Sequence, residues 1–518
     1  MFFKVRELRL VLLLLIPGCM CMSCSDGIDQ IQPAGSDVKV YFVAPTGNDS
    51  NKGTIHAPFK TIATALKNAI AGDTVLVREG TYFEKVTFPK SGTSDKMITL
   101  KAFPGEKPVI DGSYMQVLGY WEGLVTFSRV RYVTIEGFDV CNVITSTPYV
   151  DPEGITVKDG CRDITIRNCR IYNIKSNATL DGWRSAHAIL VLGNSGDPLK
   201  NITIDGCDIH DTQTGTSETV TIAGNVDGFR ISNNKVYNTE NIGIIIADGG
   251  GLYPAGNPAV NFARNGVVCD NELFNNTHTR SPEVWGENAF GAIAIYVGGA
   301  ANTIVERNKV YNNDRGIGLV SENETYPTRD CIVRNNFVYH SNRTGIYLGG
   351  YLNYTSGGTH NCYVVNNTLF FNNAVRGAFG EIEGEIRLTE NCTGNFIANN
   401  IVYARPTDVF VHKYTNTGNN NLIDYNIYYT TGSARWIWNG VSHNSFEEWQ
   451  TASVNDLHSV HGVDPLLIST SSPDLHIQAA SLAKNSGLIV SDNVNGATDI
   501  DREPRIVNNK INTGADQN

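Results

Sequence analysis

The most regular feature of this chain is an asparagine followed, two or three residues later, by an apolar residue and an aromatic one. One copy reads Asn234-Lys235-Val236-Tyr237 and another reads Asn308-Lys309-Val310-Tyr311. The positions just before each asparagine are also apolar and mostly β-branched, as at Ile304 and Val305. Such residues favour strands, and helical spacing is absent from these runs. The pattern therefore predicts short β-strands separated by corners.

The motif returns at intervals of 26 to 38 residues. Self-similarity at a period of about 20 to 50 residues indicates a solenoid. We therefore predict an all-β fold, a right-handed parallel β-helix over residues 97–430. The longer intervals leave room for loops outside the coils, as at 249–265 and 276–290. The corner positions are Gly137, Asn168, Gly206, Asn234, Asn271, Asn308, Asn336, Asn367, Asn400 and Asn426.

Asparagine and glycine suit these corners for two reasons. Both tolerate the positive φ angle that a tight corner demands. Asparagine amides stacked on successive coils can also hydrogen-bond to one another along the axis. The corners are therefore expected to form a ladder.

The two ends of the chain have different patterns. A first strand is expected at 38–43, followed by a short amphipathic helix at 62–70, where apolar residues recur at helical spacing. An open β-helix end invites aggregation, so this helix is expected to cap it. We assign 37–96 to the N-terminal cap and first coils, and 431–518 to a C-terminal closing segment.

The first 24 residues have the pattern of an export signal. Basic residues precede the apolar run 10–16, which is too short for a permanent membrane anchor. Cys24, or alternatively Cys19, is the expected lipidated residue of a bacterial lipoprotein, with 25–36 as a tether. The acidic stretch after Cys24 resembles the surface-export signal of Bacteroides-type lipoproteins, which implies the outer membrane. An ordinary cleaved signal peptide is the alternative.

Several short segments near the two ends of the chain carry a resemblance: Tyr41-Phe42-Val43-Ala44-Pro45-Thr46-Gly47-Asn48-Asp49, Pro58-Phe59-Lys60-Thr61-Ile62, Gly72-Asp73-Thr74-Val75 and, near the C-terminus, Asp464-Pro465-Leu466 and Leu475-His476-Ile477. They resemble secreted β-helical carbohydrate-active proteins of the pectate-lyase-like superfamily, which includes calcium-dependent pectate lyases and β-helical glycosidases. The resemblance covers the cap and most of the repeats. It implies the architecture and a polysaccharide substrate more specifically than a reaction.

The composition limits the classes of ligand that the protein is expected to bind. The net charge of −11 argues against nucleic acid and anionic lipid as ligands. The chain has no P-loop, GxSxG, HExxH or dinucleotide-binding motif. A single elongated domain, functioning as a monomer, is expected. Cys331 and Cys362 share one predicted column and Cys169 and Cys207 another, so buried stacked thiols are expected rather than a zinc site.

Aligning the strands that follow each corner predicts a glycan-binding face. The alignment places His187, Glu218, Asn241, Arg315 and Arg343 near one column. Asp248 and Glu322 fall near a second column, and the two long loops flank both. We expect substrate contacts from His187, Asn241, Arg264, Trp285, Glu287, Tyr296, Arg315 and Arg343.

Two mechanisms fit these columns. A glycosidase needs two carboxyl groups about 5–10 Å apart, one of them with a raised pKa. Carboxylates on neighbouring coils can meet that spacing, and the candidates are Glu218, Asp227, Asp248 and Glu322. Glu381, Glu383 and Glu385 alternate, so they are expected to be exposed, functional or metal-bound.

A polysaccharide lyase instead needs a lysine or arginine base and often Ca²⁺. The segment Asn225-Val226-Asp227-Gly228-Phe229 is similar to part of the calcium-binding stretch of pectate lyases, but no lysine or second aspartate follows nearby, and Arg230 takes the next position. Arg264, Arg315 or Arg343 would serve in an arginine-based variant. A third alternative is a non-catalytic glycan-binding β-helix. No metal or cofactor is assigned, with Ca²⁺ tied to the lyase alternative.

Overall fold

The computed structural model describes residues 38–117, 119, 121–178, 184–350, 357–376 and 382–517. The export signal, the tether and both candidate lipidation sites, Cys19 and Cys24, lie outside these residues and stay predictions. Within the described ranges, the helices are all too short or too polar to cross a membrane.

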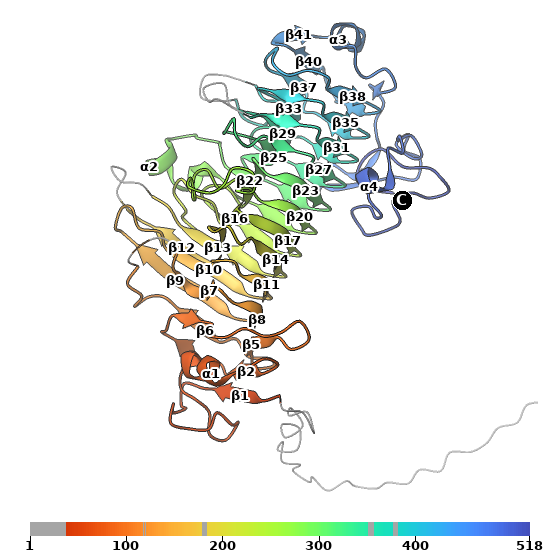
Figure 1. Cartoon of the computed structure of the whole chain (residues 1–518). Coiled ribbons are helices and arrows are strands. Elements are labelled where there is room, and N and C mark those ends of the chain that lie inside the picture. Colours follow the sequence, from red (N-terminus) through yellow and green to blue (C-terminus); the bar gives the residue numbers. More distant parts are fainter. Residues whose placement is uncertain are drawn as a thin grey trace, which may run out of the picture.

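The chain winds into a right-handed parallel β-helix whose coils stack along one axis, as the sequence predicted (Figure 1). Each coil passes through three parallel sheets in turn. In one coil, for example, β13 lies in sheet 1, β14 in sheet 2 and β15 in sheet 3.

Sheet 1 contains β4 (Val86–Thr87), β7 (Gly123–Ser128), β10 (Glu153–Lys158), β13 (His187–Gly193), β16 (Val220–Gly224), β19 (Ile244–Ala247), β22 (Ile293–Gly298), β25 (Arg315–Val320), β29 (Ile346–Gly349), β33 (Ile386–Leu388), β37 (Val409–Lys413), β40 (Arg435–Trp438) and β41 (Val441–His443). Sheet 2 contains β1 (Val40–Val43), β2 (Thr74–Val77), β5 (Ile98–Ala102), β8 (Arg131–Glu136), β11 (Arg162–Arg167), β14 (Leu199–Asp205), β17 (Val226–Ser232), β20 (Arg264–Cys269), β23 (Ala301–Glu306), β27 (Ile332–Arg334), β31 (Tyr363–Val365), β35 (Phe396–Ala398) and β38 (Leu422–Asp424), with β26 (Thr328–Arg329), β30 (Thr359–His360) and β34 (Cys392–Thr393) beside it.

Sheet 3 contains β3 (Thr81–Tyr82), β6 (Val109–Asp111), β9 (Asp139–Thr145), β12 (Arg170–Ser176), β15 (Asp208–His210), β18 (Lys235–Tyr237), β21 (Glu272–Phe274), β24 (Lys309–Tyr311), β28 (Phe337–Tyr339), β32 (Thr368–Phe370), β36 (Ile401–Tyr403), β39 (Ile427–Tyr429) and β42 (Val460–His461). The ladders thus take in strands on both sides of the expected 97–430 range.

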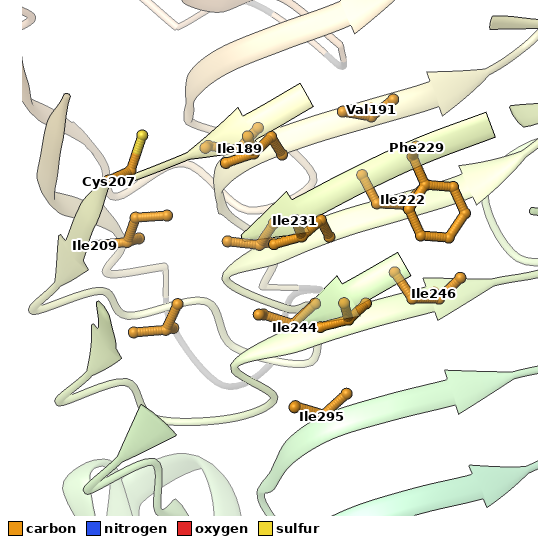
Figure 2. Packing of buried hydrophobic residues seen from close by; sticks show 14 of the residues in the cluster. Ile189, Val191, Cys207, Ile209, Ile222, Phe229, Ile231, Ile244, Ile246 and Ile295 are labelled. Atoms are coloured by element: carbon orange, nitrogen blue, oxygen red, sulfur yellow. The ribbon is translucent and has the colours of Figure 1, made fainter. Parts of the chain in front are cut away.

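The core is a set of apolar columns inside the coils. Ile222 and Ile246 point inward from consecutive strands of sheet 1 and are fully buried (Figure 2). Side chains alternate between the two faces of a strand. Thr221 and Ile245 each precede one of these isoleucines and pair with each other in register. They therefore face outward. This alternation supplies an outer face on which a site can form.

The predicted asparagine ladder is present, with its register shifted by one residue in the early coils. From Asn234 to Asn426, each side-chain amide donates to the next asparagine Oδ1 at 2.9–3.0 Å. Positive φ falls on the residue before the ladder asparagine, such as Asn233 and Asn335. The early corners Gly137, Asn168 and Gly206 also have positive φ, so the ladder column there contains Phe138, Cys169 and Cys207.

The cysteines of both predicted columns are buried free thiols, as expected. Cys207 continues the ladder through its backbone, whose N–H donates to Asn234 Oδ1 at 2.8 Å. Cys331 and Cys362 stack in the same way, with the Cys331 N–H 3.4 Å from Cys362 Sγ.

Both ends of the solenoid are covered. α1 (Ile62–Asn68) is the predicted N-terminal capping helix, and α3 (Phe446–Ser453) packs its buried Trp449 against Trp436 at the other end. The last residues, with β43 (Leu467–Ser469), β44 (Asp474–Ile477) and α4 (Asp492–Asn495), then return along the side of the coils (Figure 1). There the side chains of Asn335 and Asn399 donate to carbonyl groups of the returning segment.

Candidate functional site

A pocket of about 760 Å³ opens on the outer face of sheet 1, across β16, β19 and β22. The strands form its floor, the loops leading into them form one wall, and the corners leaving them form the other. Its lining residues are Thr216, Ser217, Glu218, Thr221, Ala223, Asn241, Ile242, Ile245, Ala247, Asp248, Gly251, Leu252, His278, Trp285, Gly291, Ile293, Tyr296, Gly298, Glu322 and Asn323. Three carboxyl groups therefore line one cavity.

Glu218 stands at the entrance of β16, on the wall where the chain enters sheet 1. Its Oε2 accepts a hydrogen bond from Thr221 Oγ1 at 3.3 Å. Burial disfavours the charged form and raises the pKa of Glu218 to about 8, and the charges of Glu322 and Asp151 act in the same direction. Glu218 is therefore protonated at neutral pH.

Asp248 stands on the opposite wall, directly after β19. Its Oδ1 accepts from the backbone N–H of Gly250 at 2.6 Å. Burial raises the pKa of Asp248 to about 6, the Gly250 hydrogen bond opposes that rise, and the charge of Glu322 adds to it.

Glu322 follows β25 on the same wall as Asp248, and its side chain is exposed. Its Oε1 accepts a hydrogen bond from the Tyr296 hydroxyl at 2.6 Å. The register places Gly318 next to Tyr296. A Cβ at Gly318 would lie 3.2 Å from Tyr296 Cδ2 and 2.7 Å from Tyr347 Cε1, so a glycine there leaves room for both rings.

The insertion at 276–290 contributes an aromatic wall. It contains η2 (His278–Arg280) and α2 (Pro282–Trp285). The rings of His278 and Trp285 stack with centroids 3.8 Å apart, and His278 Nε2 lies 3.0 Å from Asn241 Oδ1. Because an amide oxygen only accepts, Nε2 carries the proton. Burial lowers the pKa of His278 to about 3, so the ring is neutral.

Six of the predicted site residues line this pocket: Glu218, Asp248, Glu322, Asn241, Trp285 and Tyr296. Their roles stay predictions. The sequence analysis missed Thr221 and His278. Thr221 had no signal, because residues three apart in a regular strand face opposite ways, and the two side chains meet only because Glu218 precedes β16. His278 had none, because an irregular insertion determines its position.

His187 was predicted to contact substrate, but it is not among the residues that line the pocket. Its side chain is 0% exposed and lies behind Glu218, with Nδ1 2.9 Å from the Glu218 carbonyl oxygen. Glu287 was predicted to contact substrate too, but it is an exposed loop residue that does not line the pocket.

Asp227 and Arg264 lie on sheet 2 rather than at the pocket. They are register partners on β17 and β20, and Arg264 Nη2 lies 3.5 Å from Asp227 Oδ2. The other Asp227 oxygen accepts from the Asn265 amide at 2.7 Å. The prediction that Asp227 is catalytic and Arg264 binds substrate is therefore not supported for this pocket.

Arg315 and Arg343 also lie outside the pocket lining. Together with Arg387 they surround Glu383, at N–O distances of 2.7, 2.9 and 2.6 Å. Glu383 is 1% exposed, and the charges of these arginines, opposed by burial, hold its pKa far below the usual range. Glu383 and Glu385 are thus buried, which removes exposure from the three expected alternatives and leaves a functional or metal-binding role as a prediction. Glu381 lies outside the described residues.

Among the described residues, one group of three acidic side chains is close enough to share a metal ion: Asp499, Asp501 and Asp516. It lies in the C-terminal segment. Asp499 Oδ1 accepts backbone N–H groups of Asp501 and Glu503, and Oδ2 accepts that of Gln517. These carboxylate contacts hold the closing turns together.

The fold defines a right-handed parallel β-helix protein with a pocket on the outer face of one sheet. Residues 41–229 match the model of the Pel9A-like right-handed β-helix region. By similarity along most of both chains, the protein belongs to the same family as one bacterial relative. The uncharacterized protein YwoF of Bacillus subtilis (strain 168) is 31% identical over 445 residues, which cover 86% of this chain and 92% of YwoF.

Two pectate lyases are also similar. Pectate lyase PEL9 of Emericella nidulans is 29% identical over 177 residues, which cover 31% of this chain and 40% of the lyase. The crystal structure of pectate lyase Pel9A superposes with a TM-score of 0.50 at 16% identity, over 93% of this chain and 96% of that one. The β-helix fold is thus related to that of polysaccharide lyases.

Proposed function

We propose that this protein is a glycoside hydrolase acting on a polysaccharide or oligosaccharide, with Glu218 as general acid and Glu322 as its carboxylate partner. The observation that carries the proposal is the pocket on sheet 1, which Glu218 and Glu322 both line and where the charge of Glu322 acts on the Glu218 carboxyl group. Glycoside hydrolysis requires such a pair, one member protonated and the other ionised.

The environments of the two groups differ, since Glu218 is buried and Glu322 is exposed. Glu218 has a pKa raised to about 8 by burial, which suits a group that must donate a proton at neutral pH. Glu322 is exposed and accepts the Tyr296 hydroxyl, and its charge raises the pKa of both Glu218 and Asp248. It is therefore the group that serves as nucleophile or base.

The rest of the pocket favours a neutral sugar at the cleavage position. Ile245 and Ala247 form an apolar floor, and Trp285 stands on the wall with its stacked partner His278. An apolar surface with a few convergent polar groups is typical of ligand sites. Among the described residues that line the pocket, none is lysine or arginine.

A polysaccharide lyase is the second candidate function. The match of residues 41–229 to the Pel9A-like family model and the similarity to pectate lyase PEL9 favour it. β-Elimination needs a base that removes the proton beside the uronate carboxylate, and often Ca²⁺. The arginines predicted for that role are engaged with Asp227 or Glu383 outside the pocket. Hydrolysis is therefore the first choice.

The test uses the mature protein with a panel of pectic, xylan-type and host glycans. Reducing ends and the ultraviolet absorbance of unsaturated products are followed together, with and without EDTA. We expect reducing ends without absorbance. On the glycan cleaved fastest, Glu218→Gln and Glu322→Gln should each lower turnover about 100-fold, the usual scale for losing an acid or base. Asp227→Asn, which alters a carboxylate outside the pocket, is the matched control.

Absorbance rising together with reducing ends would instead establish the lyase, and loss of that signal in EDTA would add calcium. Full activity of both glutamine variants would refute the assigned pair. Binding to a glycan without cleavage would favour the third alternative, a non-catalytic glycan-binding protein.

A further inference from the structure

The side chain of His187 lies directly behind the proposed acid and out of reach of substrate. His187 is the first residue of β13 and pairs with Glu153 of β10. The register Ile189–Val220, continued back by two residues, brings His187 beside Glu218. Its Nδ1 lies 2.9 Å from the Glu218 carbonyl oxygen and 2.9 Å from Thr221 Oγ1.

These contacts fix the direction of the hydrogen bonds. A carbonyl oxygen only accepts, so His187 Nδ1 carries a proton. With that N–H pointing at the carbonyl and at Thr221 Oγ1, the hydroxyl of Thr221 is free to donate its own proton. Its acceptor is Glu218 Oε2, at 3.3 Å.

The proton of Glu218 is located by the same argument. When Oε2 accepts from Thr221, the acidic proton belongs on Oε1, the oxygen that Thr221 does not contact. We propose that His187 and Thr221 are positioning residues that orient Glu218 and keep its acidic proton on Oε1 for transfer to the substrate. This inference rests on the proposed function of Glu218.

Burial keeps the His187 ring neutral against the charge of Asp151. Asp151, which precedes β10, is fully buried, and its charge favours the imidazolium. Burial opposes this more strongly and lowers the pKa of His187. On the neighbouring strand, Glu153 is itself kept largely neutral, because burial raises its pKa to about 8. A neutral His187 donates from Nδ1 alone.

The chain contains an internal comparison. Thr156 Oγ1 donates to Oε2 of Glu153, three residues earlier in the chain. Thr221 and Glu218 have the same spacing and the same hydrogen bond. Glu153 also accepts from the backbone N–H of Trp121 and does not line the pocket. The second pair therefore offers a control, in which an equivalent threonine hydroxyl is removed outside the pocket.

The kinetic test compares His187→Leu and Thr221→Val with the conservative variants His187→Asn and Thr221→Ser. The substrate is the panel glycan that the wild-type protein hydrolyses fastest, and kcat and KM are measured across pH. Losing the orientation of an acid should lower kcat about 10- to 100-fold while KM changes less than about threefold. His187→Asn and Thr221→Ser retain a donor and should recover most of the activity, and Thr156→Val should match the wild type.

The pH profile separates this role from simple destabilisation. A general acid must be protonated, so activity falls as pH rises through the pKa of Glu218. Thr221 stabilises the ionised carboxylate, so Thr221→Val should move this alkaline limb to higher pH. His187→Leu and Thr221→Val with wild-type kcat and an unmoved limb, while Glu218→Gln is inactive, would overturn the inference. An active Glu218→Gln would instead refute the proposed function.

A second measurement does not depend on activity. Side-chain ¹⁵N NMR of the wild-type protein reports which nitrogen of each histidine carries the proton, and the His187→Asn spectrum assigns the His187 signal. The expected result is a neutral ring protonated at Nδ1. A ring protonated at Nε2 alone would overturn the inference even if the other variants failed to fold.

Discussion

At the residue scale, each ladder asparagine satisfies polar groups of two coils at once. Asn308 Oδ1 accepts the backbone and side-chain N–H groups of Asn271, and its own amide donates to Asn336 Oδ1 and the Val268 carbonyl oxygen. The side chain is fully buried. A buried donor or acceptor that loses its partner lowers the free energy of unfolding, because no water replaces the lost hydrogen bond.

We therefore expect Asn308→Ala to lower the free energy of unfolding by about 1–3 kcal/mol for each group left unpaired. Urea denaturation monitored by circular dichroism measures the change. Lys309→Ala, at the exposed next residue, is the control and should change the midpoint little. An Asn308→Ala midpoint equal to that of the control would show that the ladder adds no stability.

At the element scale, α1 closes the first coil through its ends as well as its apolar face. Thr61 Oγ1 accepts the Thr64 N–H at 3.2 Å, and the Glu84 carboxylate accepts the N–H groups of Ile62 and Ala63. Leu66 is buried beneath the helix. The cap is thus tied to the coil by both polar and apolar contacts.

Leu66→Ala should lower the free energy of unfolding by about 2–5 kcal/mol, because the end coil cannot fully close the cavity left behind. Lys67→Ala, the exposed next residue of the same helix, controls for helix propensity. Both are compared by urea denaturation, and light scattering shows whether the loosened cap exposes the coil end. A Leu66→Ala protein as stable as Lys67→Ala would show that α1 contributes little to closing the end.

The elements also show how far a sequence can predict this molecule. The strands and α1 were predictable because repeats and apolar spacing determine them, and the same columns brought Glu218, Asp248 and Glu322 toward one face. The one-residue shift at Cys169 and Cys207 was not predictable from residue identity, because asparagine occurs at both the corner and the ladder position. Nor was the stacking of His278 on Trp285, which an irregular insertion creates.

The charge of a side chain gave even less indication of how deeply that side chain is buried. His187 and Arg315 align with Glu218 and Ile293 along sheet 1, yet one is buried behind the pocket and the other turns to Glu383. A column fixes position along the axis and around the coil. It does not fix which partner a long side chain reaches.

At the scale of the whole molecule, buried carboxyl groups with raised pKa values outnumber what a single pocket needs. Glu153, Glu218 and Glu385 are each raised to about 8, and Asp456 to about 6, mainly by burial. A group whose folded pKa exceeds its unfolded pKa binds its proton more tightly in the folded state. Its stabilising contribution is complete below the unfolded pKa and is lost as pH rises through the folded pKa.

Thermal stability should therefore fall as pH rises from about 5 to about 9. Glu385→Gln should flatten this slope and stabilise the protein at the alkaline end. Its side-chain oxygen can accept both N–H groups of Asn372, as ladder asparagines do elsewhere. Scanning calorimetry across pH measures the effect.

Glu383→Gln provides the contrast. Three arginines hold the pKa of Glu383 down, so its stability is present above its unfolded pKa and is lost only in strong acid. This variant should be destabilised throughout the neutral range. Equal slopes for the wild type and Glu385→Gln would mean that Glu385 does not govern the pH response.

The ladder bonds keep the same length whether the intervening coil is short or long, from 26 residues between Asn400 and Asn426 to 37 between Asn271 and Asn308. The hydrogen bond between two successive ladder asparagines therefore does not depend on the length of the coil that joins them. In evolutionary terms, each coil is therefore a unit that duplication can add and deletion can remove without changes to the neighbouring coils. Lineages can thus lengthen the molecule or exchange its loops while the residues around the pocket are inherited intact.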